Sequence, residues 1–349
     1  MNRTRAFQLV MDALQFSGAG ALLAPLLRGR GVVFTLHHVR PQPKAAFAPN
    51  RLLEITPEFL ETAVRRIRRA GFEFVTLDEA WRRIENGAGR RFAALTFDDG
   101  YRDVRDHALP VLRRLDVPST LFITTSFADG TGDLWWLRLE EAIRRSPRIR
   151  ATLAGEDVDL PAGTTAEKEA AWNSLYWRLR SLPEDLMRTE ISQLSEGLGV
   201  VAPPFAAHLC MTWDELGDVV RSEPLVTIGA HTREHFMLAK QPEEVARVEL
   251  VESRRRIADE LGVDPRHLAY PVGDPTSAGE REFRLAREAG FTTAWTTRPG
   301  HLFGGHAQHA TALPRVSLNG YFQKGRYVDA LASGVPTALW NRFRKVNAG

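Results

Sequence analysis

Short apolar segments typical of strands alternate with amphipathic helical segments along most of this chain. The strand-like segments are rich in β-branched and aromatic residues, and they span residues 31–36, 72–75, 92–97, 119–124, 225–230, 267–270, 291–296 and 313–317. Strands separated by helices pair in parallel, because parallel neighbours need a long crossover connection. The pattern therefore predicts an α/β fold with helices outside a parallel sheet. About seven such units favour closure into a barrel, with an open doubly wound sheet as the alternative.

Capping residues indicate where two of the intervening helices begin. Thr76 with Glu79, and Ser277 with Glu280, have the spacing of a capping box. In a capping box the first side chain accepts a hydrogen bond from a backbone N–H three residues on, and the second reaches back. We therefore expect one helix to begin after Thr76 and another after Ser277.

The alternation is interrupted between residues 133 and 212, where tryptophans and arginines cluster and strand signals are few. We predict a mostly helical insertion there, with the polar stretch 155–165 as a loop. The resulting division of the chain is an N-terminal helical segment at 1–30, a barrel at 31–132 and 213–320, the helical insertion at 133–212, and a C-terminal extension at 321–349.

Both ends of the chain combine apolar and basic residues. Arg3 and Arg5 precede a loosely apolar stretch at 16–27, which is too short to span a bilayer and has no obvious cleavage site. The stretch 339–345 is similar in character. These segments predict either peripheral membrane contact or helices that pack on the domain. Without a convincing signal peptide, we expect a cytoplasmic protein or one peripheral to the inner membrane.

Composition excludes several other classes of function. The net charge is only +3, and no aromatic–basic repeat suggests a nucleic-acid partner. No glycine-rich phosphate-binding motif follows a predicted strand, which argues against a nucleotide cofactor. The single cysteine, Cys210, can form neither an internal disulfide nor a thiolate metal cluster. The oligomeric state is left open.

Two separated motifs carry the residues best suited to chemistry. Asp98 and Asp99 follow the predicted strand at 92–97, and His231 and His235 follow the one at 225–230. Active-site residues of parallel barrels gather at the carboxyl ends of the strands. The i, i+4 spacing of the histidines would bring their rings together on a helix. One carboxylate and two imidazoles would leave a divalent metal open to water, and the second carboxylate would be free to act as a base.

These motifs, in this order, resemble the first two motifs of the polysaccharide deacetylases, the NodB-homology carbohydrate esterases. The segment 268–273 resembles the third motif, and the resemblance covers roughly residues 31–320 apart from the insertion. It implies a distorted (β/α) barrel of about seven units. It also implies a metal-dependent hydrolase that removes N-acetyl groups from an amino-sugar-containing glycan.

The resemblance also implies roles for individual residues. Asp98 would be the general base, and Asp99, His231 and His235 would bind a divalent metal, with Zn²⁺ the expected ion. The backbone N–H of Val272 would stabilise the oxyanion. The residues expected around the oxyanion and substrate are Val272, Tyr270 and Arg315.

The sequence departs from the family pattern at two places. Ala269 stands where the third motif often has an arginine that braces the catalytic aspartate. Arg266 or Arg315 could substitute, although either could instead be a surface charge or form a structural ion pair. The last predicted strand, 313–317, lacks the histidine that usually serves as the acid.

A histidine at the end of the first strand could replace that missing acid. A subgroup resembling the biofilm poly-N-acetylglucosamine deacetylases uses such a residue in an aromatic-His-x-Val context. The segment 36–39 fits this pattern loosely, with leucine at the aromatic position. We therefore predict His37 as the general acid, with His38 as the alternative.

The sequence is also compatible with other functional hypotheses. The weak third motif would suit a glycan-binding module without catalysis. The basic, partly apolar termini would suit a deacylase or deformylase of a lipid-linked sugar. Trp135 and Trp136 could stack on sugar rings, but packing of the insertion onto the barrel is favoured for them.

Overall fold

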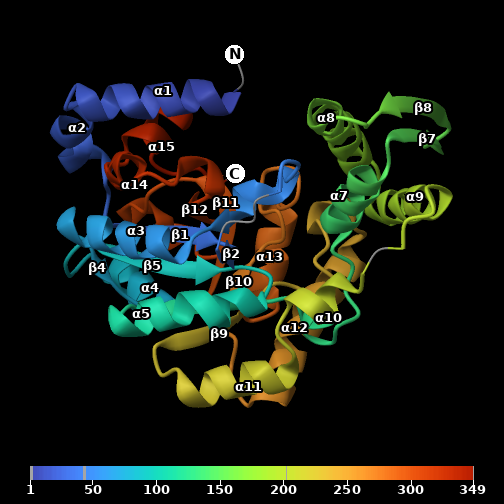
Figure 1. Cartoon of the computed structure of the whole chain (residues 1–349). Helices are drawn as coiled ribbons and strands as arrows, with labels where there is room; N and C mark the ends of the chain where they lie inside the picture. The colour runs from blue at the N-terminus through green and yellow to red at the C-terminus, as the bar shows by residue number, and fades with distance from the viewer. Residues whose placement is uncertain (1–2, 42–44, 202, 349) are drawn as a thin grey trace.

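A computed structural model describes residues 3–41, 45–201 and 203–348. Seven parallel strands pair in sequence order around a closed ring (Figure 1): β1 (Gly31–Leu36), β5 (Phe92–Phe97), β6 (Ser119–Ile123), β9 (Val226–Ala230), β10 (His267–Ala269), β11 (Thr293–Pro299) and β12 (Leu313–Ser317). The ring closes because β1 pairs with both β5 and β12. The predicted barrel of seven units is therefore confirmed, and the open sheet is excluded.

The barrel strands read as continuous apolar runs because both of their faces are covered. Every residue of β1, β5 and β6 is buried. Strands covered on one face only would show polar alternation instead. The predicted strand at 72–75 forms only the short β4 (Glu73–Phe74), which pairs with the first residues of β5 outside the ring. Two more short strands, β2 (His38–Val39) and β3 (Glu54–Ile55), pair beyond the end of β1.

Helices surround the ring. They are α3 (Pro57–Arg69), α4 (Leu77–Asn86), α5 (Leu109–Arg114) after a π turn at Val104–Ala108, α6 (Thr125–Ala128), α11 (Trp213–Ser222), α12 (Glu243–Leu261), α13 (Glu280–Glu288), α14 (Gly325–Ala332) and α15 (Val335–Trp340). Short 3₁₀ turns lie at Pro49–Leu53, Leu238–Lys240, Gly304–Gln308 and Gly320–Phe322.

One of the two predicted helix starts is correct. Thr76 Oγ1 accepts from the backbone N–H of Glu79 at 3.2 Å, and α4 begins at the next residue. The start predicted after Ser277 is wrong. The Ser277 hydroxyl donates to the carbonyl of Asp274 in the preceding turn, and the Glu282 carboxylate accepts from the N–H of Gly279 just before α13.

Most of the chain between α6 and α11 forms a lobe beside the barrel (Figure 1). This insertion lobe comprises α7 (Trp135–Arg145), β7 (Arg148–Leu153), β8 (Glu156–Pro161), α8 (Thr165–Ser181) and α9 (Glu184–Gly197), and α10 (Phe205–Leu209), which contacts α6, leads back to the barrel. The loop predicted at 155–165 is wrong, because β8 forms an antiparallel hairpin with β7. The mostly helical insertion thus contains a hairpin. The exposed residues of β8 include Glu156, Asp157 and Asp159, and this acidic composition hides the strand signal.

The N-terminal helices α1 (Arg3–Phe16) and α2 (Ala19–Leu27) lie against α14 and α15, the last helices of the chain (Figure 1). Among the described residues, no helix combines the length and the apolar character needed to cross a bilayer.

Candidate functional site

The two adjacent aspartates stand where β5 ends. The backbone N–H of Asp98 still donates to Leu36 of β1, and the chain then turns sharply, with φ of 73° at Asp99 and 72° at Gly100. A left-handed conformation is easy for glycine and uncommon for aspartate. Both carboxylates are buried. The strained turn separates the two side chains, so that the two neighbouring carboxylates contact different groups.

The two histidines follow β9 in an irregular loop, and the helix expected for them is wrong. Thr232 and His235 have φ of 63° and 58°, which no helix allows. The ring centroids nevertheless lie 5.0 Å apart. Both Nε2 atoms approach Asp99 Oδ1, at 3.4 Å from His231 and 3.3 Å from His235. A bent loop therefore achieves the convergence that a helical spacing would have provided.

This group of donor atoms fits a divalent metal. One ligand atom from each of Asp99, His231 and His235 lies within 4.8 Å of the others. Three tetrahedral ligands at about 2.0–2.1 Å from zinc are roughly 3.3–3.4 Å apart, which matches the distances from Asp99 Oδ1 to the two nitrogens. This oxygen is buried and has no hydrogen-bond donor among the described residues. A buried acceptor without a donor is costly unless a cation occupies the space between these atoms.

Hydrogen bonding orients the first imidazole. His231 Nδ1 lies 2.7 Å from the carbonyl oxygen of Ala269, so that nitrogen carries the hydrogen and Nε2 presents a lone pair. Burial alone would lower the pKa of His231, but Asp99 and Asp98 raise it. Protons therefore compete for the donor atoms, and metal binding would release them.

Aromatic rings hold the second imidazole. His235 stacks on Phe127 of α6 at 5.6 Å between centroids and lies 5.0 Å from the ring of Trp136 on α7. Trp135 and Trp136 are both buried. The packing role favoured for these tryptophans agrees with this burial, and neither ring is free to stack on a sugar. The insertion lobe thus forms one wall of the site.

Asp98 is held by an arginine from the last barrel strand. Arg315 Nη1 and Nη2 donate to the two carboxylate oxygens at 2.7 and 2.8 Å, and Thr35 Oγ1 adds a hydrogen bond at 3.3 Å. The Arg315 side chain has no exposed surface. Arg266, the other candidate, lies at the surface and pairs with Asp78. The arginine missing at position 269 is therefore replaced in space by Arg315.

This partner keeps Asp98 ionised. Burial alone would raise the pKa of the Asp98 carboxyl, but Arg315 and His231 lower it below its ordinary value. Burial acts in the same direction on Asp99, where the facing imidazoles of His231 and His235 prevail and lower the pKa well below its usual range. Both aspartates are therefore anions, one paired with a guanidinium and the other facing imidazoles.

The two histidines at the end of β1 differ in their surroundings. His37 is partly exposed and lies close enough to the cluster to feel its charges; desolvation lowers the pKa of His37, and Asp99 and Asp98 oppose the shift. His38 turns away: its Nδ1 lies 2.6 Å from Asp103 Oδ2, and its ring stacks on Tyr101 at 3.6 Å. Of the two candidates, the structure brings only His37 to the cluster.

The third motif contains a strained backbone shortly after Ala269, whose carbonyl contacts His231. Val272 has a φ of 62°, an outlier for a β-branched residue. Thr297 holds it there, because its Oγ1 donates to the Val272 carbonyl at 2.6 Å. The Val272 N–H has no acceptor within the described part of the chain. The hydroxyl of Tyr270, by contrast, donates to Thr311 at 2.8 Å, so this side chain packs under α13 rather than facing the cluster.

Several supporting residues escaped the sequence analysis. Tyr101 is fully buried next to the motif, and burial with the nearby Asp99 holds its pKa well above the ordinary value. From α9, Glu184 accepts from the N–H of Met237 at 2.7 Å, and Arg188 donates to the carbonyl of Glu234 at 3.1 Å. Only the position of Tyr101, directly after the Asp-Asp-Gly turn, offered a signal. The two α9 contacts join segments about 50 residues apart.

Glu249 of α12 also supports the histidine loop. Its Oε2 accepts from the backbone N–H groups of Arg233 and Glu234 at 3.0 and 2.8 Å. Burial raises the pKa of this carboxyl to about 7, even though both N–H groups act in the opposite direction. The folded protein therefore binds this proton more tightly than the unfolded chain, and the free energy of unfolding falls as the pH rises from about 4.5 to about 7.

We expect Glu249→Gln to remove this dependence. Glutamine keeps an acceptor for the two N–H groups but does not ionise. The decrease in unfolding free energy between pH 5 and pH 8 should shrink by about 3 kcal/mol, to order of magnitude. Urea unfolding at both pH values measures it. Glu252→Gln, on the exposed face of the same helix, is the matched control. Equal pH dependence in all three proteins would contradict a raised pKa at Glu249.

Several solved structures share the fold of this barrel. The Streptococcus pyogenes deacetylase PplD, in complex with acetate, is 14% identical over 83% of this chain and 93% of its own, with a TM-score of 0.56. IcaB from Ammonifex degensii is 18% identical over 86% and 97%, with a TM-score of 0.53. BC0361, a polysaccharide deacetylase from Bacillus cereus, is 16% identical over 83% and 65%, with a TM-score of 0.51. At such identities the likeness establishes the fold alone.

A match to a family model, rather than a likeness of fold, shows the family of this chain. No curated protein matches the sequence of this chain. The family model described as polysaccharide deacetylase matches residues 85–294, which is more than half of the chain and includes both the aspartate turn and the histidine loop. The chain therefore belongs to the polysaccharide deacetylase family.

Proposed function

We propose that this protein is a metal-dependent hydrolase that removes N-acetyl groups from the amino sugars of a glycan. The proposal rests on the different partners of two adjacent aspartates at the end of one barrel strand. Three donor atoms of Asp99, His231 and His235 converge, and the neighbouring Asp98 is held apart from them by Arg315. Metal-assisted hydrolysis requires a metal site with an ionised base beside it.

Asp99, His231 and His235 would hold the metal. Two imidazoles and one carboxylate are typical ligands of catalytic zinc, which leaves room for water and substrate. Once bound, such an ion polarises the amide carbonyl and acidifies water in contact with it.

The side chains of this protein supply the proton transfers. Asp98 accepts the proton of the attacking water, and Arg315 and Thr35 orient its carboxylate for that step. The carbonyl carbon becomes tetrahedral, and the Val272 N–H donates to its oxygen. His37 then donates a proton to the departing amine as the C–N bond breaks. Acetate and the free amino sugar leave.

We expect the zinc-loaded protein to release acetate from an N-acetylglucosamine oligosaccharide. Removal of the metal with a chelator should abolish the release, and added zinc should restore it. An enzymatic acetate assay, with metal content measured on the same sample, tests both points. Absence of acetate from every acetylated oligosaccharide tried, with the metal site filled, would overturn the proposal. Sugar binding that persists after chelation, without hydrolysis, would favour a binding module instead.

A further inference from the structure

Large apolar side chains are exposed at the two ends of the chain to an unusual degree. Among the described residues of the segments 3–27 and 335–348, nine large apolar side chains are more than a third exposed: Leu9, Val10, Phe16, Leu22, Leu23, Leu26, Leu339, Trp340 and Phe343. The most exposed are Phe16 and Leu22, each at 79%, and Leu26 at 71%. Single exposed apolar residues need no explanation, but a concentration of them indicates an interaction surface.

These residues lie on helices that pack together. Leu9 and Phe16 are seven residues apart on α1, and Leu22 and Leu26 are four apart on α2, so each pair shares one helix face. α2 contacts both α1 and α15, and α15 carries Leu339 and Trp340. No charged residue occurs in α2. We call the outward faces of α1, α2 and α15 the terminal apolar surface.

Positive charge is concentrated in the same segments. Residues 1–30 and 321–349 contain nine basic and two acidic side chains, a net charge of +7 against +3 for the whole chain. Both acids are neutralised within the fold: Asp12 pairs with Arg326, and Asp329 pairs with Arg66. Three exposed cations, Arg342, Arg344 and Lys345, follow α15 directly. The rest of the molecule is therefore net negative.

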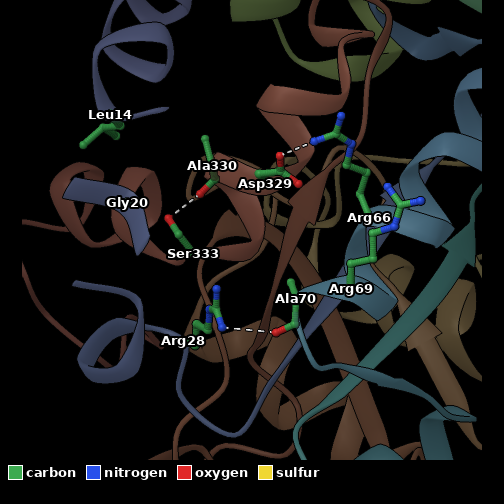
Figure 2. Close-up of a pocket in the computed structure, with 9 residues that line it drawn as sticks. All are labelled: Leu14, Gly20, Arg28, Arg66, Arg69, Ala70, Asp329, Ala330 and Ser333. Atoms are coloured by element: carbon green, nitrogen blue, oxygen red, sulfur yellow. Dashed lines mark hydrogen bonds and ion pairs between the residues drawn. The ribbon is translucent and has the colours of Figure 1, made fainter. Parts of the chain in front are cut away.

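A cavity of about 300 Å³ lies between the α1–α2 turn and helices α3 and α14 (Figure 2). Leu14 and Gly20 lie on one side of it, and three arginines lie on the other sides, namely Arg28, Arg66 and Arg69. Arg28 donates to the carbonyl of Ala70 at 3.1 Å, and its Nε is buried without a partner among the described residues. With Asp329 as the only acid in the lining, the cavity is net positive and suits a phosphate group.

We propose that the terminal apolar surface is a docking surface for an anionic lipid bilayer, and that the arginine-lined cavity receives the phosphate of a lipid headgroup. Apolar side chains would enter the boundary between headgroups and acyl chains, and the surrounding cations would face the negative lipid surface. The charge distribution favours an anionic lipid bilayer over a second copy of the chain. A second copy of the chain would bring terminal segments of net charge +7 against identical segments.

Co-sedimentation of the full chain with lipid vesicles tests the proposal. We expect binding to vesicles of equal parts phosphatidylglycerol and phosphatidylcholine to exceed binding to pure phosphatidylcholine by about tenfold or more, and to weaken as salt is added. Leu22→Glu/Leu26→Glu should lower binding to the anionic vesicles by about tenfold or more. Val248→Glu, at a residue of similar chemistry that is 39% exposed on α12, is the matched control and should bind like the unmodified protein.

Further measurements distinguish a lipid headgroup from a soluble anion and from a second copy of the chain. Arg69→Gln should weaken binding to the anionic vesicles, because this exposed arginine lines the cavity. Binding of inorganic phosphate without vesicle binding would assign the cavity to a soluble anion and overturn the proposal. A stable dimer in light scattering that Leu22→Glu/Leu26→Glu dissociates, again without vesicle binding, would also overturn it. So would equal vesicle binding by that variant and the unmodified protein. Circular dichroism confirms that each variant is folded.

Discussion

We expect Asp98→Asn to lower kcat by about 10²–10⁴-fold, the range typical of a lost general base, with little change in metal content. Asparagine has nearly the shape of aspartate but cannot take the proton of the attacking water. The Asp98 carboxylate contacts Arg315 and Thr35, whereas the cluster that could hold the metal is formed by Asp99, His231 and His235. Loss of the base should therefore leave the metal site intact.

Substitution of the neighbouring Asp99 should instead reduce the metal content. Asp99→Asn replaces an anionic ligand with a neutral amide, and His231→Ala removes a donor atom, so zinc affinity should fall by more than the roughly 10–100-fold that loss of an outer-shell partner costs. Acetate release and zinc content, measured by mass spectrometry on the same preparations, separate the two classes of variant. Asp103→Asn is the control, because Asp103 binds His38 outside the cluster. Equal metal content in Asp98→Asn and Asp99→Asn would show that the division of roles is wrong.

The barrel and the convergence of its motifs were predictable from local signals. Strands buried on both faces leave continuous apolar runs in the sequence, as in residues 92–97, and chemistry gathers where such strands end. Asp98, Asp99, His231 and His235 all occupy such positions. The arrangement of the histidine loop was not predictable, because a spacing of four residues fits a helix as well as the bent loop that Glu249 holds.

The partner of Asp98 depends on contacts that no local pattern records. Arg315 lies 217 residues away in the chain. It reaches Asp98 only because β12 closes the ring against β1, and β1 pairs with β5 in a register that sets Phe97 opposite Leu36. Long-range register of this kind is set by the closure of the whole barrel. The hairpin strand β8 escaped prediction for a different reason, since its acidic outer face resembles a loop.

The Asp98–Arg315 pair supports a second prediction with a large effect. Arg315→Met should reduce the free energy of unfolding by about 3–5 kcal/mol, because it leaves a buried carboxylate without its counter-charge. Catalysis should fall as well, since the carboxylate loses the two hydrogen bonds that aim it. Arg315→Lys keeps the charge but not the planar pair of donors, so both properties should be intermediate. Urea unfolding and acetate release, measured side by side, test these expectations.

The double variant Asp98→Asn/Arg315→Met separates stability from catalysis. Removing both charges eliminates the uncompensated ion, so the double variant should be more stable than Arg315→Met alone. It should nevertheless be as inactive as Asp98→Asn, because the base is gone. If Arg315→Met kept the kcat of the unmodified protein while losing stability, Arg315 would be a structural partner only. A loss of kcat that exceeds any change in KM, with partial rescue by lysine, is the result that a positioning role requires, because the guanidinium acts on the substrate only through the orientation of Asp98.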